Sequence, residues 1–414
     1  MGQPLHWPGP MTVPDAPPQQ PSASAAPVAW AAGVLRREAD AGRLRRPRRR
    51  AGGSGPVAEV DGRTVVVFSS NDYLGLAADP RVRRAAADAA LQDGVGSTGS
   101  RHLSGCHAAI DALEAELCAF EGAPAATLAP SGYAANVALL QALGGRDALV
   151  LSDERNHASL IDGCRLSRGA VEVYRHRDLH DLATRLRAAG GRRAIIASDT
   201  VFSMDGTVAP VAGLVALAER HGAWLVLDEA HATGVLGPGG RGAAAEAEVD
   251  PAHPQVVRVV TLSKGLGAQG AAICGDPLVR QLLLQRGRAL IFSTALPHPT
   301  VAAARAAVAV LAAEPERVDR LRANVARLRS ALAPLEPAGR FDIPVLPVPA
   351  GAEDRALALE AALLERGMLV QAVRPPTVPA GTSRLRIAVS AVHTPEHLDA
   401  LAEALLAVVG AAGR

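Results

Sequence analysis

A single lysine stands among the basic residues of this chain. Lys and Arg total 43 in 414 residues, and all of them except Lys264 are arginines. Arginine keeps its proton in proteins, whereas a lysine with a lowered pKa can act as a nucleophile and form an imine. Lys264 follows an apolar run in VVTLSKGLG (residues 259–267), where Thr261, Ser263 and backbone N–H groups beside glycines could receive a phosphate. Lys264 is therefore a candidate for amine chemistry; the alternative is a surface lysine retained by chance.

An acidic and an imidazole side chain end another apolar run. In LVLDEAHATG (residues 225–234), Asp228 closes the run and His231 follows three positions later. Ligands bind beyond the carboxyl ends of strands in open α/β sheets, so groups at such a point can act on a ligand. The alternative is that Asp228 caps the next helix. This segment alone supports both interpretations equally.

A turn of small residues opens a predicted helix in APSGYAANVALL (residues 129–140). The N–H groups and the dipole at a helix N-terminus favour anions. The segment is not a P-loop, because no GK[ST] follows, and residues 95–105 do not match GxGxxG. An amine, a carboxylate and an anion site are what pyridoxal 5′-phosphate (PLP) needs for its carbonyl, its pyridinium nitrogen and its phosphate. The three segments together predict a PLP enzyme in which Asp228 keeps that nitrogen protonated.

Composition excludes several other classes. The formal net charge of +2 argues against a general nucleic-acid binder, and the short basic run at residues 43–50 reads first as a solvated linker or an anion contact. The four cysteines form no CxxC pair, so no metal or redox site is predicted. No signal peptide or apolar stretch of about 18 residues is visible. We expect a soluble cytoplasmic protein without a nucleic-acid or membrane partner.

These side chains must be positioned by a layered α/β fold. The hydrophobic content is 49% with only 3% aromatic residues, which suits helices packed on a parallel sheet. Short apolar runs alternate with amphipathic segments. Strands are predicted at residues 65–70, 148–153, 171–176, 193–200, 223–230, 255–263, 271–276 and 289–295. Helices are predicted at residues 79–94, 107–122, 131–143, 157–167, 179–190 and 211–222.

The pattern changes after Pro297, where a smaller α+β domain is predicted. It would comprise a helix at 300–335, a strand at 343–348, a helix at 354–366, strands at 368–373 and 383–390, and a last helix capped by Thr394. The predicted division is a disordered Pro-rich extension (1–28), a helix and linker (29–60), a large PLP-binding domain (61–296) and a small C-terminal domain (297–414).

Nine motifs resemble the α-oxoamine synthases, a family of fold-type I PLP enzymes. The similarity runs in order from about Ala31 to the C-terminus. The motifs are SSNDYLGLA, GSTGSRHLSG, SGYAAN, NHASLIDG, FSMDGTVAP, LDEAHATGVLG, TLSKGLG, IFSTALP and RPPTVPAGTSRLRIAVSA. The last motif is most similar to the members that condense L-alanine with a pimeloyl thioester, carried by CoA or by acyl-carrier protein. The resemblance therefore implies a decarboxylating acyltransferase of biotin biosynthesis.

The resemblance also implies roles for individual residues. Lys264 would hold PLP and act as the base at the amino-acid Cα, Asp228 would pair with the pyridinium nitrogen, His231 would contact the phenolic oxygen and His157 would stack on the ring. A helix histidine that faces the core is the commoner situation for His157. The other implied contacts are Gly132, Tyr133, Ser203 and Thr261 with the cofactor; Arg386, Thr377, Arg45 and also His157 with substrates; and Ser293 and Thr294 with the phosphate of a partner subunit. The last pair implies a homodimer.

Two departures and several alternatives remain at this point. Asp199 stands where the family pattern has Glu, which shortens a side chain expected near the acyl site, and Ala232 replaces a Gly. A glycine-using family member is the first alternative function. A non-catalytic subunit of a heterodimeric synthase is disfavoured because Lys264 is present. Nucleic-acid binding through residues 43–50 is disfavoured because no aromatic residues interleave with the arginines.

Overall fold

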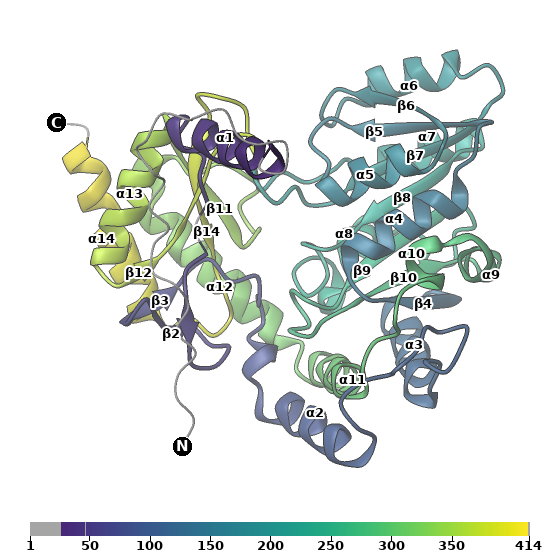
Figure 1. Ribbon diagram of the computed structural model, residues 1–414, viewed down its shortest axis with the longest axis horizontal. Coiled ribbons are helices and arrows are strands. Elements are labelled where there is room, and N and C mark those ends of the chain that lie inside the picture. Colours follow the sequence, from purple (N-terminus) through teal and green to yellow (C-terminus); the bar gives the residue numbers. More distant parts are fainter. Residues whose placement is uncertain (1–25, 46, 413–414) are drawn as a thin grey trace.

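A seven-stranded sheet forms the centre of the larger part of the molecule (Figure 1). The computed structural model describes residues 26–45 and 47–412. The strands lie in the order β4-β10-β9-β8-β7-β5-β6, and only the two pairings of β10 are antiparallel. The predicted, mostly parallel sheet is confirmed. The strands are β4 (Ala125–Ala129), β5 (Ala148–Asp153), β6 (Ala170–Tyr174), β7 (Arg193–Asp199), β8 (Trp224–Asp228), β9 (Val256–Thr261) and β10 (Ala271–Gly275).

Helices cover both faces of this sheet. Successive residues of a strand point to opposite faces, so Leu149 and Leu151 enter one apolar core and Ala148 and Val150 enter another. The first core includes residues of α2 (Pro80–Gln92), α3 (Ala108–Glu121), α6 (Leu179–Ala188), α7 (Val211–His221) and α11 (His298–Ala313). The second includes residues of α4 (Gly132–Leu143), α5 (Ala158–Leu166), α9 (Pro277–Arg286) and α10 (Arg288–Ile291). Burial on both faces explains why the strands, apart from the mostly exposed edge strand β6, read as short, uninterrupted apolar runs.

A second, antiparallel sheet lies in the C-terminal part of the chain. Its strand order is β11-β14-β13, and helix α14 begins at Pro395, as the capping pattern predicts. The hydroxyl of Thr394 accepts a hydrogen bond from the backbone N–H of His397 at 3.4 Å. The elements are α12 (Glu316–Ala331), β11 (Val345–Gly351), α13 (Glu353–Glu365), β13 (Gln371–Val373), β14 (Ser383–Ala388) and α14 (Pro395–Ala412).

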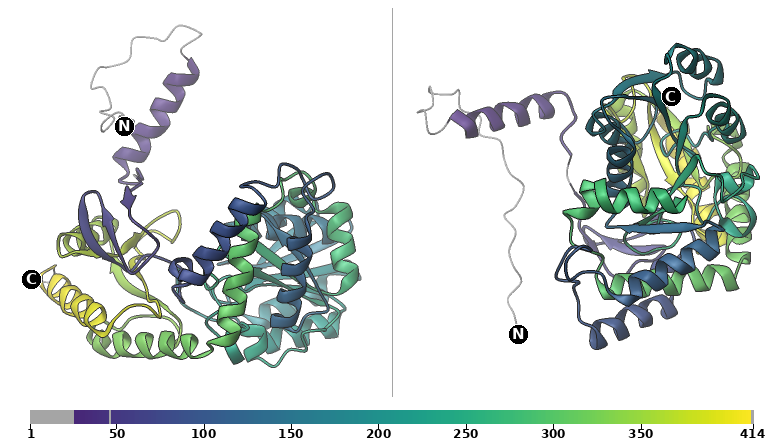
Figure 2. Two further views of the ribbon diagram at one scale, coloured as in Figure 1. Left: turned by 90° about the horizontal axis from the view of Figure 1, so that it is seen from below. Right: turned by 90° about the vertical axis from the view of Figure 1, so that its right-hand side faces the viewer.

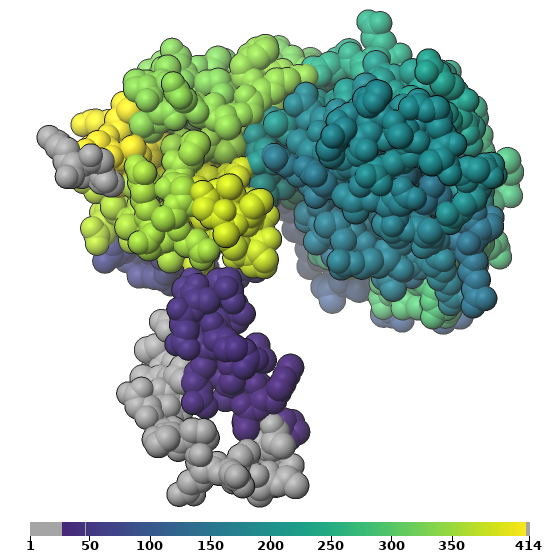
Figure 3. All heavy atoms as spheres, turned by 90° about the horizontal axis from the view of Figure 1, so that it is seen from above, coloured from purple at the N-terminus to yellow at the C-terminus, as the bar shows by residue number. Residues whose placement is uncertain are grey.

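Residues near the N-terminus pack against this C-terminal part. Strands β1 (Arg50–Ala51), β2 (Val57–Val60) and β3 (Arg63–Val67) form a sheet that β12 (Met368–Leu369) extends parallel to β3. Helix α1 (Ala26–Asp40) projects away from the rest of the molecule (Figures 2 and 3). Residues 1–25 of the predicted extension lie outside the described residues. The predicted division into domains stays a prediction.

Two expected elements differ in the structure. Residues 289–295, expected as a strand, instead include helix α10, whose Leu290 and Ile291 N–H groups donate to the carbonyl of Gly287 at 2.8 and 3.0 Å. Four successive apolar residues cannot distinguish a buried helical turn from a strand. The long helix expected at 300–335 is two helices, because Pro315 interrupts it between α11 and α12.

The sequence pattern also missed strand β4, which is built mainly from small residues.

None of the helices in residues 26–45 and 47–412 combines the length and the apolar character that a membrane-spanning helix requires.

Candidate active site

Lys264 lies in the loop that leaves the sheet at the carboxyl end of β9. Its side chain is half-buried, and its amine makes no hydrogen bond or ion pair within the described residues. Burial lowers the pKa of this amine; the carboxylates of Asp228 and Asp199 oppose the shift, and the charge of Arg386 adds to it. A lowered pKa makes the neutral, nucleophilic amine more available. The structure thus places the lysine near two acidic side chains and one arginine whose charges act on its amine.

Asp228 is a buried acid at the carboxyl end of β8. Its Oδ2 accepts a hydrogen bond from Nδ2 of Asn136 in α4 at 2.6 Å, and its Oδ1 accepts one from the backbone N–H of Ala230 at 2.9 Å. The same Asn136 amide donates to the hydroxyl of Ser159 in α5 at 2.9 Å. Both contacts orient the carboxylate at the strand end. The sequence pattern did not single out Asn136, although SGYAAN contains it.

His157 follows β5 and Asp199 ends β7, the neighbouring strand of the same sheet. His157 is the N-cap of α5: its ring Nδ1 accepts from the backbone N–H of Ser159 at 3.2 Å. Its own backbone N–H donates to Oδ2 of Asp199 at 2.7 Å. Burial and the nearby charge of Asp228 raise the pKa of Asp199 well above its ordinary value. Asp199 is therefore hydrogen-bonded to His157, a residue predicted for the cofactor, and its expected place near the acyl site stays a prediction.

His231 is buried and contacts a tyrosine from a distant segment. Its Nδ1 is 2.6 Å from the hydroxyl Oη of Tyr73. Burial lowers the pKa of His231 well below its ordinary value, and the charges of Lys264 and Arg386 add to this shift. Its neighbour Ala232, which replaces a glycine of the family pattern, is not among the residues with positive φ, so the replacement introduces no backbone strain.

Arg386 is a buried cation on β14. Only 7% of its surface is exposed, yet its guanidinium has no carboxylate partner within the described residues. Its Nε donates to the carbonyl of Ser203 at 2.8 Å and its Nη2 donates to Oδ1 of Asn71 at 3.1 Å. A buried charge is costly unless it is paired. Arg386 therefore offers a site for an anionic group.

The N-terminus of α4 faces the end of β9. The hydroxyl of Thr261 is buried without a hydrogen-bond partner in the described chain. A Cβ atom at Gly132 would lie 2.6 Å from that hydroxyl oxygen, so only glycine leaves this space open. The next residue, Tyr133, is 47% exposed, and its hydroxyl donates to Asp162. Gly132 and Thr261 thus come together, as an anion site requires.

Four predicted residues make no hydrogen bond with Lys264 in the described residues. Arg45 and Thr377 contact each other, because Nη2 of Arg45 donates to the Thr377 hydroxyl at 3.3 Å. Thr294 forms a bridge with Ser100, and with Ser293 it lines a small cavity next to Pro130 and Leu296.

A larger cavity, of about 390 Å³, adjoins the cluster. Its lining includes Asn71, Asp72, Gly267 and Ser263, the residue before Lys264. Burial raises the pKa of Asp72 to about 6, although backbone N–H groups oppose the shift. The cavity brings solvent-accessible space to the segment that contains Lys264.

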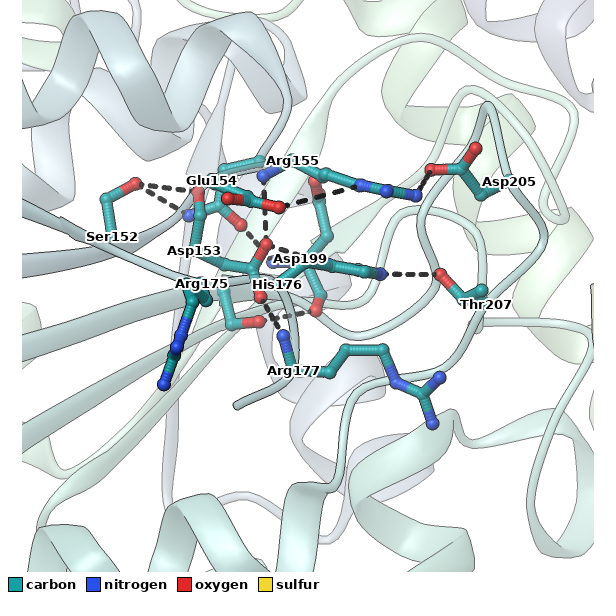
Figure 4. Close-up of polar contacts among 12 residues, drawn as sticks. Ser152, Asp153, Glu154, Arg155, Arg175, His176, Arg177, Asp199, Asp205 and Thr207 are labelled. Carbon is teal, nitrogen blue, oxygen red and sulfur yellow. Dashed lines mark hydrogen bonds and ion pairs between the residues drawn. The ribbon is translucent and has the colours of Figure 1, made fainter. Parts of the chain in front are cut away.

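The loop that contains Ser203 is held at several points (Figure 4). Asp205 accepts a hydrogen bond from Nη1 of Arg155 at 2.9 Å and also pairs with Arg384 of β14. The hydroxyl of Thr207 lies 3.1 Å from Nε2 of His176, a residue that follows β6. The Ser203 carbonyl that accepts from Arg386 is therefore part of a fixed loop.

Comparisons with known proteins decide the family. The model of the family described as aminotransferase class I and II matches residues 63–405. An 8-amino-7-oxononanoate synthase of Anaeromyxobacter dehalogenans (strain 2CP-1 / ATCC BAA-258) is 51% identical over 356 residues, which cover 86% of this chain and 89% of that protein. The chain belongs to the 8-amino-7-oxononanoate synthase family. The resemblance noted in the nine motifs is confirmed.

Solved structures of related proteins have the same fold as this chain. Serine palmitoyltransferase of Sphingomonas wittichii is 30% identical with a TM-score of 0.87, and the match covers 94% of this chain and 98% of that chain. A variant serine palmitoyltransferase of S. paucimobilis, whose structure holds PLP joined to myriocin, is 28% identical with the same TM-score of 0.87, covering 94% and 99%. The predicted fold-type I architecture is confirmed.

Proposed function

We propose that the protein condenses L-alanine with a pimeloyl thioester, carried by CoA or by acyl-carrier protein. The products are 8-amino-7-oxononanoate, CO2 and the free thiol of the carrier, and PLP is the cofactor. This reaction belongs to biotin biosynthesis. The proposal is supported by one observation on a chain that is 51% identical to an 8-amino-7-oxononanoate synthase. Its one lysine lies close enough to the buried Asp228 and to Arg386 for their charges to affect its pKa, and Arg386 has no carboxylate partner in the described residues.

The residues around Lys264 fit PLP. The amine of Lys264 would hold the cofactor, and the buried carboxylate of Asp228 would pair with the pyridinium nitrogen. The unpartnered hydroxyl of Thr261 and the open space at Gly132 support a phosphate at the start of α4. When bound, PLP supplies an electron sink that stabilises negative charge at the amino-acid Cα. His157 and His231 would contact its ring, and Ser203 and Tyr133 would lie nearby.

Each polar group of the chain then has a task. Lys264, whose pKa is lowered by burial, would take the proton from Cα of alanine and later return a proton. Asp228 is kept in one orientation by Asn136 and the Ala230 N–H group, so its charge stays directed beyond the strand end. Burial lowers the pKa of His231 well below its ordinary value and so favours the neutral ring, in which one nitrogen can donate a hydrogen bond and the other can accept one.

Arg386 would bind the carboxylate of alanine. The absence of a carboxylate partner in the described residues, together with two fixed hydrogen bonds, leaves the rest of the guanidinium fork available. The Arg45–Thr377 pair would contact the acyl substrate. In this arrangement the amino-acid and acyl substrates are bound by separate groups, and alanine is oriented by its carboxylate.

A homodimer is part of the proposal, with Ser293 and Thr294 reaching the phosphate site of the partner subunit. Two neighbouring segments support it: the Ser97 hydroxyl donates to the Ala295 carbonyl at 2.6 Å, and Ser100 bridges Thr294. These segments and their flanks carry large apolar side chains that are strongly exposed, namely Leu91, Val95, Leu103 and Phe292. Exposed apolar side chains that gather in one region mark protein–protein interfaces.

The test is mass spectrometry of the product that the PLP-loaded protein forms. Alanine and glycine would each be supplied with pimeloyl-CoA and with acetyl-CoA. We expect 8-amino-7-oxononanoate from alanine and pimeloyl-CoA, in clear excess over the other three products. Preferred use of glycine with acetyl-CoA would instead favour the glycine-using function. Absence of any product with all four pairs, and with pimeloyl-acyl-carrier protein, would refute the proposal.

A further inference from the structure

Tyr73 lies between His231 and Asn71 in the active-site cluster. Its side chain is fully buried, and its hydroxyl Oη is 2.6 Å from Nδ1 of His231 and 3.3 Å from Oδ1 of Asn71. The same Asn71 oxygen accepts a hydrogen bond from Nη2 of Arg386 at 3.1 Å. A chain of three contacts therefore runs from the arginine that lacks a carboxylate partner in the described residues to the imidazole of His231.

The hydroxyl of Tyr73 has one proton to donate, and two acceptors compete for it. Oδ1 of Asn71, at 3.3 Å, is farther than a normal O–H···O hydrogen bond and already accepts from Arg386. Nδ1 of His231, at 2.6 Å, lies within the range of a strong hydrogen bond. The geometry therefore favours donation from Tyr73 to His231.

This donation determines where His231 carries its own proton. Burial and the charges of Lys264 and Arg386 lower the pKa of His231, which favours the neutral ring. In a neutral imidazole one nitrogen donates and the other accepts, so an accepting Nδ1 leaves the proton on Nε2. Nε2 of His231 has no hydrogen-bond partner within the described residues, so it is available to a ligand.

We propose that Tyr73 is a positioning residue that sets the tautomer of His231, so that Nε2 carries the proton and can donate to the phenolic oxygen of PLP. The proposal rests on the proposed function, which supplies the PLP. An imidazole is commonly oriented through a hydrogen bond to its other nitrogen, and loss of that bond weakens whatever the ring binds. Asn71, which lies between Tyr73 and Arg386 in this chain of contacts, orients the guanidinium of Arg386.

The direct test is neutron diffraction from crystals of the PLP-loaded protein exchanged into heavy water. We expect deuterium on Nε2 of His231, none on Nδ1, and a Tyr73 hydroxyl deuterium directed at Nδ1. Deuterium on Nδ1, with the Tyr73 hydroxyl directed at Asn71, would overturn the proposal. This measurement needs no substrate, so it stays informative even if the product assay refutes the proposed condensation.

Three variants supply a second test. Tyr73→Phe should shift the absorption spectrum of bound PLP and lower kcat about tenfold, with little change in the KM for alanine. Tyr174→Phe is the matched control, because Tyr174 is also buried and its hydroxyl has no partner in the described chain; its spectrum should match the wild type. Asn71→Ala should raise the KM for alanine and leave the spectrum unchanged. A wild-type spectrum for Tyr73→Phe would contradict the proposed role.

Discussion

At the scale of a single residue, one substitution can distinguish the positive charge of Lys264 from its ability to form an imine. Lys264→Arg keeps a positive charge near Asp228 and Asp199 but has no amine that can lose its proton. We expect the absorption band of bound PLP to disappear and turnover to fall by about a thousandfold or more. The control is Lys264→Arg combined with Arg355→Lys, which restores one lysine to the chain at an exposed position. If either variant retained the band and the turnover, Lys264 would not be the essential amine.

Which site residues can be predicted depends on where their partners lie in the sequence. Asp228 and Thr261 end strands, and His231 and Lys264 follow the same strands three residues later, so their position alone marks them as candidates. Tyr73 carries no such signal, since its partner His231 is 158 residues away. Asn136 and Asn71 were missed for the same reason, because their contacts with Asp228 and Arg386 span 92 and 315 residues. Only the folded chain brings these amides and this hydroxyl to the charged groups.

At the scale of elements, Asp79 joins two helices. Its carboxylate caps α2 by accepting from the backbone N–H of Arg81 at 3.0 Å, and it accepts from Nη2 of Arg317 in α12 at 2.7 Å. The hydrogen bonds from the Arg81 side chain, above all, lower the pKa of Asp79 to about 2. Because this pKa lies below that of the unfolded chain, the stabilisation is complete above about pH 4 and is lost as pH falls toward 2.

Two substitutions separate the cap from the charge. Asp79→Asn should keep the cap and lower the free energy of unfolding at pH 7 by about 1–3 kcal/mol, because Arg317 loses a buried carboxylate. Asp79→Ala should cost about 1 kcal/mol more, through loss of the cap. Urea unfolding from pH 7 to pH 3 measures both values. The gap between wild type and Asp79→Asn should narrow below pH 4; a gap independent of pH would exclude the charge as its source.

Strands could be predicted from the sequence where burial on both faces of the sheet requires an uninterrupted run of apolar residues. Residues 148–153 are predicted as a strand and form β5 with those bounds. The strand predicted at 289–295 was wrong, because the apolar residues there lie partly in a buried helical turn and partly at the exposed Phe292. Strand β4 was missed because small residues carry little hydrophobic signal. Tertiary packing, rather than local pattern, decides both cases.

For the whole molecule, the proposed homodimer predicts an active site built from two subunits. Within one chain Thr294 bridges Ser100 and makes no hydrogen bond to Lys264 in the described residues, and the proposed dimer assigns its phosphate contact to a partner subunit. We therefore expect Lys264→Ala and Thr294→Glu to be inactive alone, the second because a carboxylate would repel the phosphate. In a random mixture of the two chains, half of the dimers are hybrids, and each hybrid holds one site without either change.

Co-expression should consequently restore about a quarter of wild-type turnover in the mixture, and about half in hybrids purified through a different tag on each chain. Light scattering would check the mass of the dimer. If Thr294→Glu prevented dimer formation, Ser293→Ala combined with Thr294→Ala, assayed at limiting PLP, would take its place. A site completed within one chain would leave every hybrid inactive. Restored turnover in purified hybrids would place Lys264 and Thr294 in one site from two subunits.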